Sequence, residues 1–290
     1  MTWFRNYEFS DRFIFWRSTV EREPRAAAAH NQLGLVYLQR GEISKAEDEF
    51  KKSIIYAQRP LTVVNAKVNL AGVKILKREL DEALVILKEI LAINGLPPPR
   101  IYEDLGIVLM EMGKEKEALA AWRKELDFFP RSPRVYALMG LYFLKKRNWE
   151  KGKELLTLAL KLEPDSPLAY YGLGKIAQER GDLQLAVSLF RRAIALKFDI
   201  AGAHYSLGRI YLSSGEYEKA KFEFEVTINL DPNFKEAYND LAVIYASDTP
   251  PDWKKAKEYI DKARELGFPV KEGLLKIINQ HQVPAFDTSS

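Results

Sequence analysis

The sequence predicts an all-α protein built as a linear array of about seven helical hairpins. Three observations lead to this fold class. A leucine followed by a small residue, as in Leu207-Gly208, returns at intervals of about 34 residues. A second small residue, such as Ala220, follows each leucine at a nearly constant distance. Prolines such as Pro232 recur at the same period, and because proline cannot continue a helix interior, each interval is predicted to be one unit.

Residues 1–24 are predicted to form an aromatic-rich capping helix. Ser10 and Asp11 can cap a helix that runs to about Glu23. The apolar face of this helix is expected to consist of Phe13, Phe15, Trp16 and Val20. No repeat precedes this segment, so we expect it to pack like the second helix of a missing hairpin.

Residues 25–268 are predicted to form the seven units. Their leading pairs are Leu33-Gly34, Leu70-Ala71, Leu105-Gly106, Met139-Gly140, Leu173-Gly174, Leu207-Gly208 and Leu241-Ala242. The later small residues are Ala46, Ala83, Ala118, Gly152, Ala186, Ala220 and, after an insertion at 248–252, Ala256. Small side chains at both positions let two antiparallel helices approach to about 8–10 Å. Glycines between the helices suit the left-handed conformation that ends the first helix: Gly41, Gly113, Gly181 and Gly215.

Residues 269–290 are predicted to form a C-terminal capping helix and a loose tail. Helical apolar spacing is carried by Val270, Leu274, Ile277, Ile278 and His281. This helix is expected to cover the open face of the last unit, because terminal repeats of such arrays need a cap. The tail begins at Pro284.

These recurring positions resemble the tetratricopeptide repeat family over residues 25–268. The resemblance implies a right-handed superhelical solenoid of about seven helix-turn-helix repeats with capping helices at both ends. It also implies a protein-binding scaffold. Three residues depart from the family pattern: Ala71 and Lys74, where glycine and tyrosine are usual, and Phe198 in place of a proline.

Composition and motifs argue against several other functions. The net charge of +4 is too small to indicate nucleic-acid binding, and the absence of cysteine removes thiol chemistry. No apolar run reaches the ~20 residues of a membrane span. The only histidines are His30, His204 and His281, and the first two occupy a repeat position that tyrosine fills elsewhere. We therefore expect a non-enzymatic chain with no catalytic, cofactor-binding or metal-binding residues and no cofactor.

In the tetratricopeptide family the first helix of each repeat lines an inner groove that contacts an extended peptide or a partner helix. Carried over by position, this resemblance implies ten partner-binding residues here: Asn31, Asn65, Asn69, Arg100, Arg134, Tyr171, Lys175, Tyr205, Arg209 and Asn239. Tyr171/Lys175 and Tyr205/Arg209 repeat one motif on adjacent units. Tyrosines beside two cations are predicted to hold an acidic segment or a C-terminal carboxylate of a partner. Ordinary contacts between repeats and a solvated rim are the alternative interpretation.

Two further hypotheses concern the ends of the chain. The residues from Asn6-Tyr7 to Pro24 resemble the junction between membrane domain and repeat array in bacterial O-mannosyltransferase-like proteins. On that hypothesis the chain is the recruiting or regulatory array of a membrane glycosyltransferase, tethered to a membrane protein and facing the periplasm or the cell exterior. If Met1 is the true start, a cytoplasmic location is expected instead. The apolar first helix also allows a structural protein that self-associates through its end helices.

Overall fold

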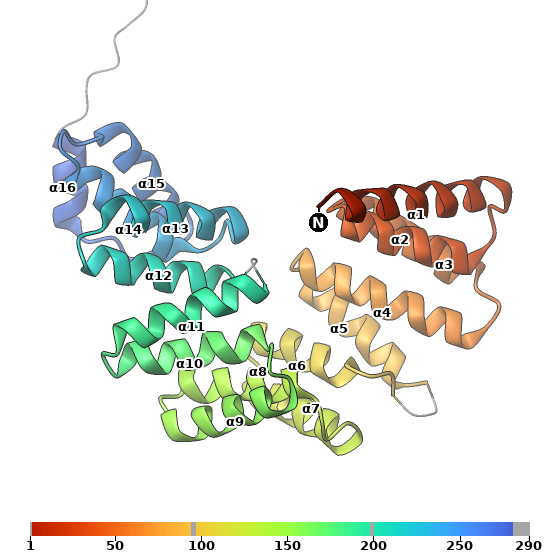
Figure 1. Ribbon diagram of the computed structural model, residues 1–290. Coiled ribbons are helices and arrows are strands. Elements are labelled where there is room, and N and C mark those ends of the chain that lie inside the picture. Colours follow the sequence, from red (N-terminus) through yellow and green to blue (C-terminus); the bar gives the residue numbers. More distant parts are fainter. Residues whose placement is uncertain (1, 94–96, 198–199, 281–290) are drawn as a thin grey trace, which may run out of the picture. The chain divides into compact units, whose positions relative to one another are not determined.

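The computed structural model describes residues 2–93, 97–197 and 200–280, with side chains described from residue 11 onward. All regular elements within these residues are α-helices, and they fall into two compact units, 1–135 and 136–290. The helices of unit 1 are α1 (Thr2–Arg22), α2 (Ala27–Gln39), α3 (Ile43–Tyr56), α4 (Pro60–Leu76), α5 (Leu80–Leu91), α6 (Ile101–Glu111) and α7 (Glu115–Phe128) (Figure 1). The all-α class predicted by the sequence is confirmed.

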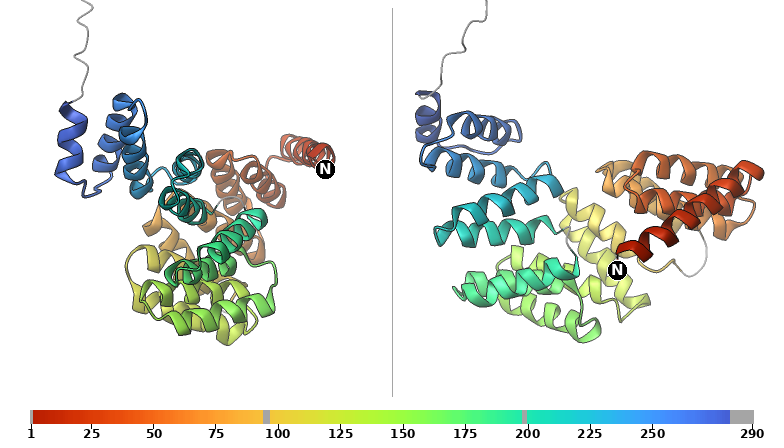
Figure 2. Two further views of the ribbon diagram at one scale, coloured as in Figure 1. Left: turned by 60° about the vertical axis from the view of Figure 1, so that its left-hand side comes forward. Right: turned by 45° about the horizontal axis from the view of Figure 1, so that its top comes forward.

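Unit 2 contains four further helix pairs and a terminal helix, which Figure 2 shows from two more directions. Its helices are α8 (Pro133–Lys145), α9 (Trp149–Leu162), α10 (Pro167–Glu179), α11 (Leu183–Leu196), α12 (Ala201–Ser213), α13 (Tyr217–Leu230), α14 (Lys235–Ser247), α15 (Trp253–Glu265) and α16 (Glu272–Gln280). The first three residues of α8 belong to unit 1. The helices of one hairpin, such as α12 and α13, pack more extensively than neighbouring hairpins do.

The repeated small residues create the close approach within each hairpin. A Cβ atom added to Gly208 would lie 2.5 Å from Cε1 of Phe224, a side chain with no exposed surface. Gly34 and Gly174 have the same relation to a buried phenylalanine, at 2.6 Å in each case. At 2.2 Å from the indole nitrogen of Trp122, a Cβ on Gly106 would be closer still. The small residue therefore leaves room for the large aromatic side chain of the second helix.

In six of the hairpins, the turn between the two helices contains one residue in the left-handed conformation. Gly181 has φ +79° and Gly215 has φ +76°. In two units an arginine, Arg78 or Arg147, takes this conformation with φ near +58°. A left-handed non-glycine residue costs about 1–2 kcal/mol, so the hairpin packing must compensate for that strain.

Lys74, where the repeat pattern has tyrosine, is buried at 5% exposure inside a cluster of carboxylates. Its ammonium lies 2.8 Å from Glu47 on α3, 2.5 Å from Glu79, the residue before α5, and 2.7 Å from Glu82 on α5. Burial opposes the charge of Lys74, but these three carboxylates outweigh it and raise the pKa of Lys74. The departure from the pattern thus replaces an aromatic contact with an ion cluster that joins three helices.

His30 and His204 are each 2% exposed, in agreement with a packing role. Each also binds a carboxylate of the second helix, which sequence reasoning did not anticipate. Nδ1 of His30 lies 2.5 Å from Glu49, and Nδ1 of His204 lies 2.7 Å from Glu223. Nε2 of His30 also contacts the backbone carbonyl of Pro24 at 3.0 Å.

The first helix differs from the expectation in two respects. It begins at Thr2, so Ser10 and Asp11 lie inside it and do not cap it. Phe13 packs against the Tyr37 ring with 5.7 Å between centroids, whereas Phe15 is 55% exposed. Phe15 was expected on the packed face, but it lies two residues beyond Phe13, which turns it to another side of the helix.

At the other end, α16 packs on α15 and buries Ile278 to 1% exposure, while Ile277 remains 48% exposed. Ile277 was expected on the apolar face, but it stands next to Ile278 in sequence and so points about 100° away. The predictions made for Phe198, His281 and the tail from Pro284 fall outside the described residues.

Candidate partner-binding groove

The candidate residues of unit 2 lie on three consecutive first helices. Tyr171 and Lys175 are four residues apart on α10, and Tyr205 and Arg209 are four residues apart on α12. Residues at this spacing share one face of a helix. The interval of 34 residues places the second pair at the same position of the next hairpin. Asn239, one interval further, lies on α14.

The pair on α12 converges on a carboxylate from the following first helix. The hydroxyl of Tyr205 donates to Oδ2 of Asp240 at 3.1 Å, and Nη1 of Arg209 donates to the same oxygen at 3.4 Å. Nδ2 of Asn239 donates to the other carboxylate oxygen at 3.3 Å. Asp240 is only 7% exposed, so these three donors stabilise a largely desolvated charge.

The electrostatics of this arrangement reflect burial opposed by pairing. Burial raises the pKa of Asp240, although Arg209 and the donors Tyr205 and Asn239 act in the opposite direction. Burial and the adjacent carboxylate both raise the pKa of Tyr205. The phenol therefore stays protonated at neutral pH and acts as a hydrogen-bond donor.

The pair on α10 has no such carboxylate. Tyr171 packs on Phe190 with 6.0 Å between ring centroids, and its hydroxyl lies against the backbone of α12 at Gly202. Within the described residues, neither the Tyr171 hydroxyl nor the Lys175 ammonium makes a hydrogen bond or ion pair. Burial lowers the pKa of Lys175, and the positive charge of Arg209 lowers it further, against the opposite influence of Glu179. Lys175 is thus a half-buried cation that feels the charge of Glu179 but makes no ion pair within the described residues.

The candidate residues of unit 1 do not form one matching set. Nδ2 of Asn69 donates to Oδ1 of Asn31 at 2.9 Å, which links α4 to α2. Asn65 is exposed on α4. The asparagine pair satisfies part of its own hydrogen-bonding capacity and fixes two first helices to each other.

Arg100 and Arg134 both lie near the buried carboxylate of Glu103. The distances to its Oε1 are 3.5 Å from Nη2 of Arg100 and 3.1 Å from Nε of Arg134, although neither geometry makes a hydrogen bond to that oxygen. Burial raises the pKa of Glu103 and of the adjacent Asp104, against the opposing effect of the two arginines. These arginines therefore face an internal acid rather than forming a free basic site.

Two carboxylates near these candidates were missed as partners by sequence reasoning. Glu125 on α7 accepts from the backbone N–H of Arg100 at 2.8 Å and of Tyr102 at 3.2 Å, so it caps the N-terminus of α6. Asp240 lies 35 residues beyond Tyr205 and 31 beyond Arg209. A spacing of about one repeat places a residue on the next first helix, so the sequence could have predicted that Asp240 lies near Tyr205 and Arg209.

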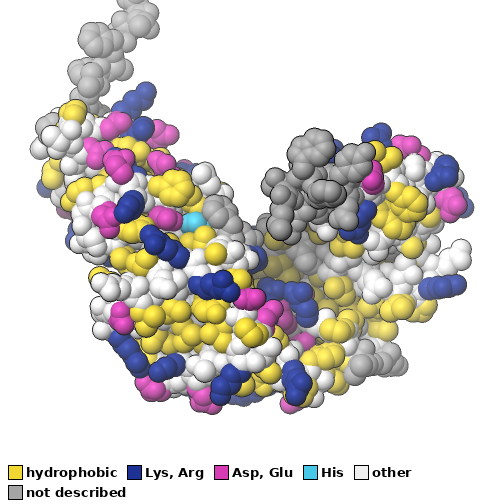
Figure 3. Space-filling model, viewed as in Figure 1, with side chains coloured by type: hydrophobic (Ala, Val, Ile, Leu, Met, Phe, Trp, Pro, Cys, Tyr) yellow, Lys and Arg dark blue, Asp and Glu magenta, His cyan; other side chains and the backbone are white. Residues whose placement is uncertain are grey.

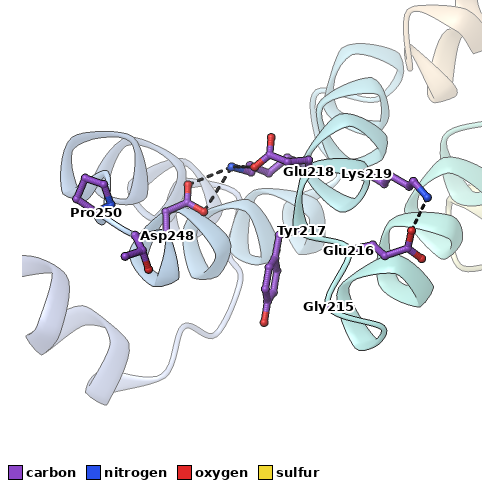
Figure 4. A pocket seen from close by; sticks show the side chains of 9 residues that line it. Gly215, Glu216, Tyr217, Glu218, Lys219, Asp248 and Pro250 are labelled. Atoms are coloured by element: carbon purple, nitrogen blue, oxygen red, sulfur yellow. Dashed lines mark hydrogen bonds and ion pairs between the residues drawn. The ribbon is translucent and has the colours of Figure 1, made fainter.

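Unit 2 also has an open pocket of about 670 Å³ where α13 begins and where the inserted loop after α14 starts. Figure 4 shows that its charged side chains pair with one another. Lys221 lies 3.1 Å from Asp248 and 2.6 Å from Glu218, and Lys219 pairs with Glu216. These pairs leave little unsatisfied charge to attract a ligand.

The described part of the chain contains no group of three or more His, Asp or Glu side chains arranged to hold a metal ion. No helix within it is both long and apolar enough to cross a membrane. On the face drawn in Figure 3, the dark blue and magenta side chains are interspersed rather than gathered into a field of one sign.

Paired helices at a constant period, with polar side chains on successive first helices, define a helical-repeat scaffold. One family model described as tetratricopeptide repeat matches residues 16–60 and 137–200. A second model with the same description matches residues 201–234. The chain belongs to the tetratricopeptide repeat family. Members of this family generally act as protein-interaction scaffolds without catalytic activity, and the chain has that architecture.

Solved structures agree with this fold. A chain of the APC/C hetero-tetramer Cut9–Hcn1 matches with a TM-score of 0.64 and 17% identity over 88% of the present chain, which spans only 46% of that protein. A tetratricopeptide repeat protein from Parabacteroides merdae matches with a TM-score of 0.54 and 16% identity, covering 87% of this chain and 97% of the other. At these identities the likeness concerns the fold alone. No curated protein matches the sequence significantly.

Proposed function

We propose that the chain is a non-enzymatic scaffold that holds an acidic segment of a partner protein along α10, α12 and α14 of unit 2. The observation that carries this proposal is the difference between the two tyrosine–cation pairs on α10 and α12. Lys175 and Arg209 occupy equivalent positions, and of the two only Arg209 makes an ion pair with a carboxylate of the described residues. A partner segment with Asp or Glu side chains, or with a free C-terminal carboxylate, supplies the missing negative charge.

Selection of peptides on the full-length chain tests this proposal. A library of random peptides displayed on phage is expected to yield acidic sequences, whose affinity is then measured with synthetic peptides. Lys175→Glu is expected to weaken binding by at least about tenfold, because it replaces attraction by repulsion in a partly desolvated site. Lys153→Glu changes the net charge equally on the exposed face of α9 and serves as the matched control.

Three outcomes would contradict the proposal. The library could yield no binder, or binders without acidic residues. The two charge reversals could also weaken binding equally, which would indicate non-specific attraction to the whole chain rather than a groove. Binding that decreases with ionic strength in the wild type but not in Lys175→Glu supports the groove, since screening acts on the charge pair that the variant lacks.

A second candidate function is self-association through α1. Ile14 and Phe15 on this helix are 62% and 55% exposed, and the Phe15 ring packs edge-on against Trp16 at 4.8 Å. A second copy of the chain would bury this face. Light scattering over a range of concentrations tests the idea, since a strict monomer at high concentration excludes it and Phe15→Glu is expected to reverse any association. The glycosyltransferase hypothesis stays a prediction from sequence.

A further inference from the structure

Unit 2 contains two successive copies of the same tyrosine–cation pair, and the copies differ in one facing residue. Tyr205 and Arg209 on α12 face Asp240 on α14. At the matching position one repeat earlier, Tyr171 and Lys175 on α10 are followed by Ser206 on α12. The chain therefore provides its own comparison between a pair with a carboxylate and a pair without one.

The α12 copy shows how the pair binds an anion. One carboxylate oxygen of Asp240 accepts from both the Tyr205 hydroxyl and the Arg209 guanidinium. The tyrosine is held in place by Phe224 and Phe234, with ring centroids 5.6 and 4.7 Å away. A rigid phenol and a cation that meet at one oxygen form a carboxylate receptor. In this copy the receptor is filled from within the chain.

The α10 copy has the same scaffold but lacks the acid. Tyr171 packs on Phe190, the counterpart of Phe224, and its hydroxyl reaches Gly202, one helical turn from Ser206. The hydroxyl of Ser206 is used within its own helix, because it donates to the Gly202 carbonyl at 2.8 Å. Ser206 thus supplies neither charge nor a hydrogen bond to the pair.

The charged groups around Lys175 support this comparison. Arg209 on α12 repels it, and Glu179 on α10 attracts it from one turn away without forming an ion pair within 4 Å. Burial, the larger effect, lowers the pKa of Lys175. An anion placed beside Lys175 would relieve both the desolvation cost and the repulsion from Arg209.

We propose that Tyr171 and Lys175 form a vacant carboxylate receptor that takes an Asp or Glu side chain, or the C-terminal carboxylate, of the partner segment, in the role that Asp240 has for Tyr205 and Arg209. This inference rests on the proposed function and makes it more specific. The partner's acid is placed at the α10 pair, and Asp240 excludes it from the α12 pair.

A test without any ligand uses Ser206→Asp in the full chain, which supplies the missing carboxylate internally. The melting temperature is expected to rise by about 2–4 °C relative to Ser206→Asn, because a desolvated lysine gains a charged partner. The gain should disappear when Lys175→Gln is added, as a double-mutant cycle measures. A gain that is absent, or that persists without Lys175, would overturn the receptor geometry.

A second test compares three peptides. The first alternates Glu and Ala and has both ends blocked, and the second alternates Gln and Ala with both ends blocked. The third is the Gln–Ala peptide with a free C-terminal carboxylate. Ser206→Asp is expected to weaken binding of the Glu–Ala peptide at least about tenfold relative to Ser206→Asn. Binding of only the third peptide would assign the receptor to a C-terminal carboxylate. Asp240→Ser vacates the second receptor and is expected to strengthen binding.

The outcomes separate the two proposals. If no peptide binds the wild type, the proposed function fails, while the ligand-free test still decides whether the receptor exists. If Glu–Ala binds but Ser206→Asp has no effect, or if Asp240→Ser weakens binding, the scaffold function stands and the receptor assignment is wrong. The Asp240→Ser variant keeps the test decisive should Ser206→Asp fail to fold.

Discussion

Gly208 offers a direct test of the packing argument. An alanine there would place Cβ 2.5 Å from Cε1 of Phe224, whereas ordinary carbon contacts lie near 3.5–4.0 Å, so about 1 Å of movement is required. Phe224 has no exposed surface and cannot turn outward. Overpacking of this kind costs about 1–3 kcal/mol, and the higher helix propensity of alanine offsets about 1 kcal/mol. We expect Gly208→Ala to lower the free energy of unfolding by up to about 2 kcal/mol.

Gly72 is the matched control, because it also lies inside a first helix but a Cβ there meets no atom within 4 Å. Gly72→Ala is expected to stabilise unit 1 by about 1 kcal/mol through helix propensity alone. Urea titration followed by circular dichroism measures both variants, and hydrogen exchange assigns each change to its unit. If Gly208→Ala is stabilised as much as Gly72→Ala, the close approach of the two helices is not what the small residue provides.

Three further predictions concern charge and burial. Burial opposes the charge of Glu47, but three lysines lower its pKa to about 2 from 4.5, so its stabilising effect is present above pH ~4.5 and lost as the pH falls toward 2. Up to ~3 kcal/mol should disappear over that range in wild type but not in Glu47→Gln, as unfolding titrations at several pH values will show. Ala186→Arg places a charge at a site with no exposed surface and should cost about 3–5 kcal/mol, measured as a fall in melting temperature; a negligible change would contradict the assigned register. Glu125→Gln should destabilise α6 by about 1–3 kcal/mol in urea titrations, because a side-chain amide offers one acceptor where the carboxylate serves two backbone N–H groups.

The sequence predicted the hairpin architecture well because the repeated residues act locally. Gly208 and Phe224 meet within one hairpin, and Gly215 supplies the left-handed turn between its two helices. Such relations depend on a short stretch of chain and recur at a fixed period. The same reasoning anticipated the burial of His30 and His204, since each stands where neighbouring units have an aromatic residue.

Interactions between successive units were harder to predict. The sequence shows that Lys74 departs from the pattern, but not that Glu47, Glu79 and Glu82 converge on it, because their meeting depends on how three helices pack. Asp240 is a further example, since its spacing places it on the next first helix while its burial and its three donors emerge only from the fold.

The direction of single side chains was the third difficulty. Phe15 and Ile277 are apolar residues that turn to solvent, because each stands one or two residues from the true packed face. The same difficulty applies to the candidate groove. Arg100 and Arg134 were predicted from their positions in the repeat, but both side chains lie beside the internal carboxylate of Glu103.

The most direct test of the central claim is the dissociation constant of an acidic peptide, obtained by selection on the full chain, for wild type, Lys175→Gln and Lys153→Gln. Isothermal titration with the same peptide in all three provides it. We predict an affinity at least about tenfold weaker for Lys175→Gln and unchanged for Lys153→Gln. Equal affinities of all three proteins would contradict the assignment of the partner segment to the first helices of unit 2.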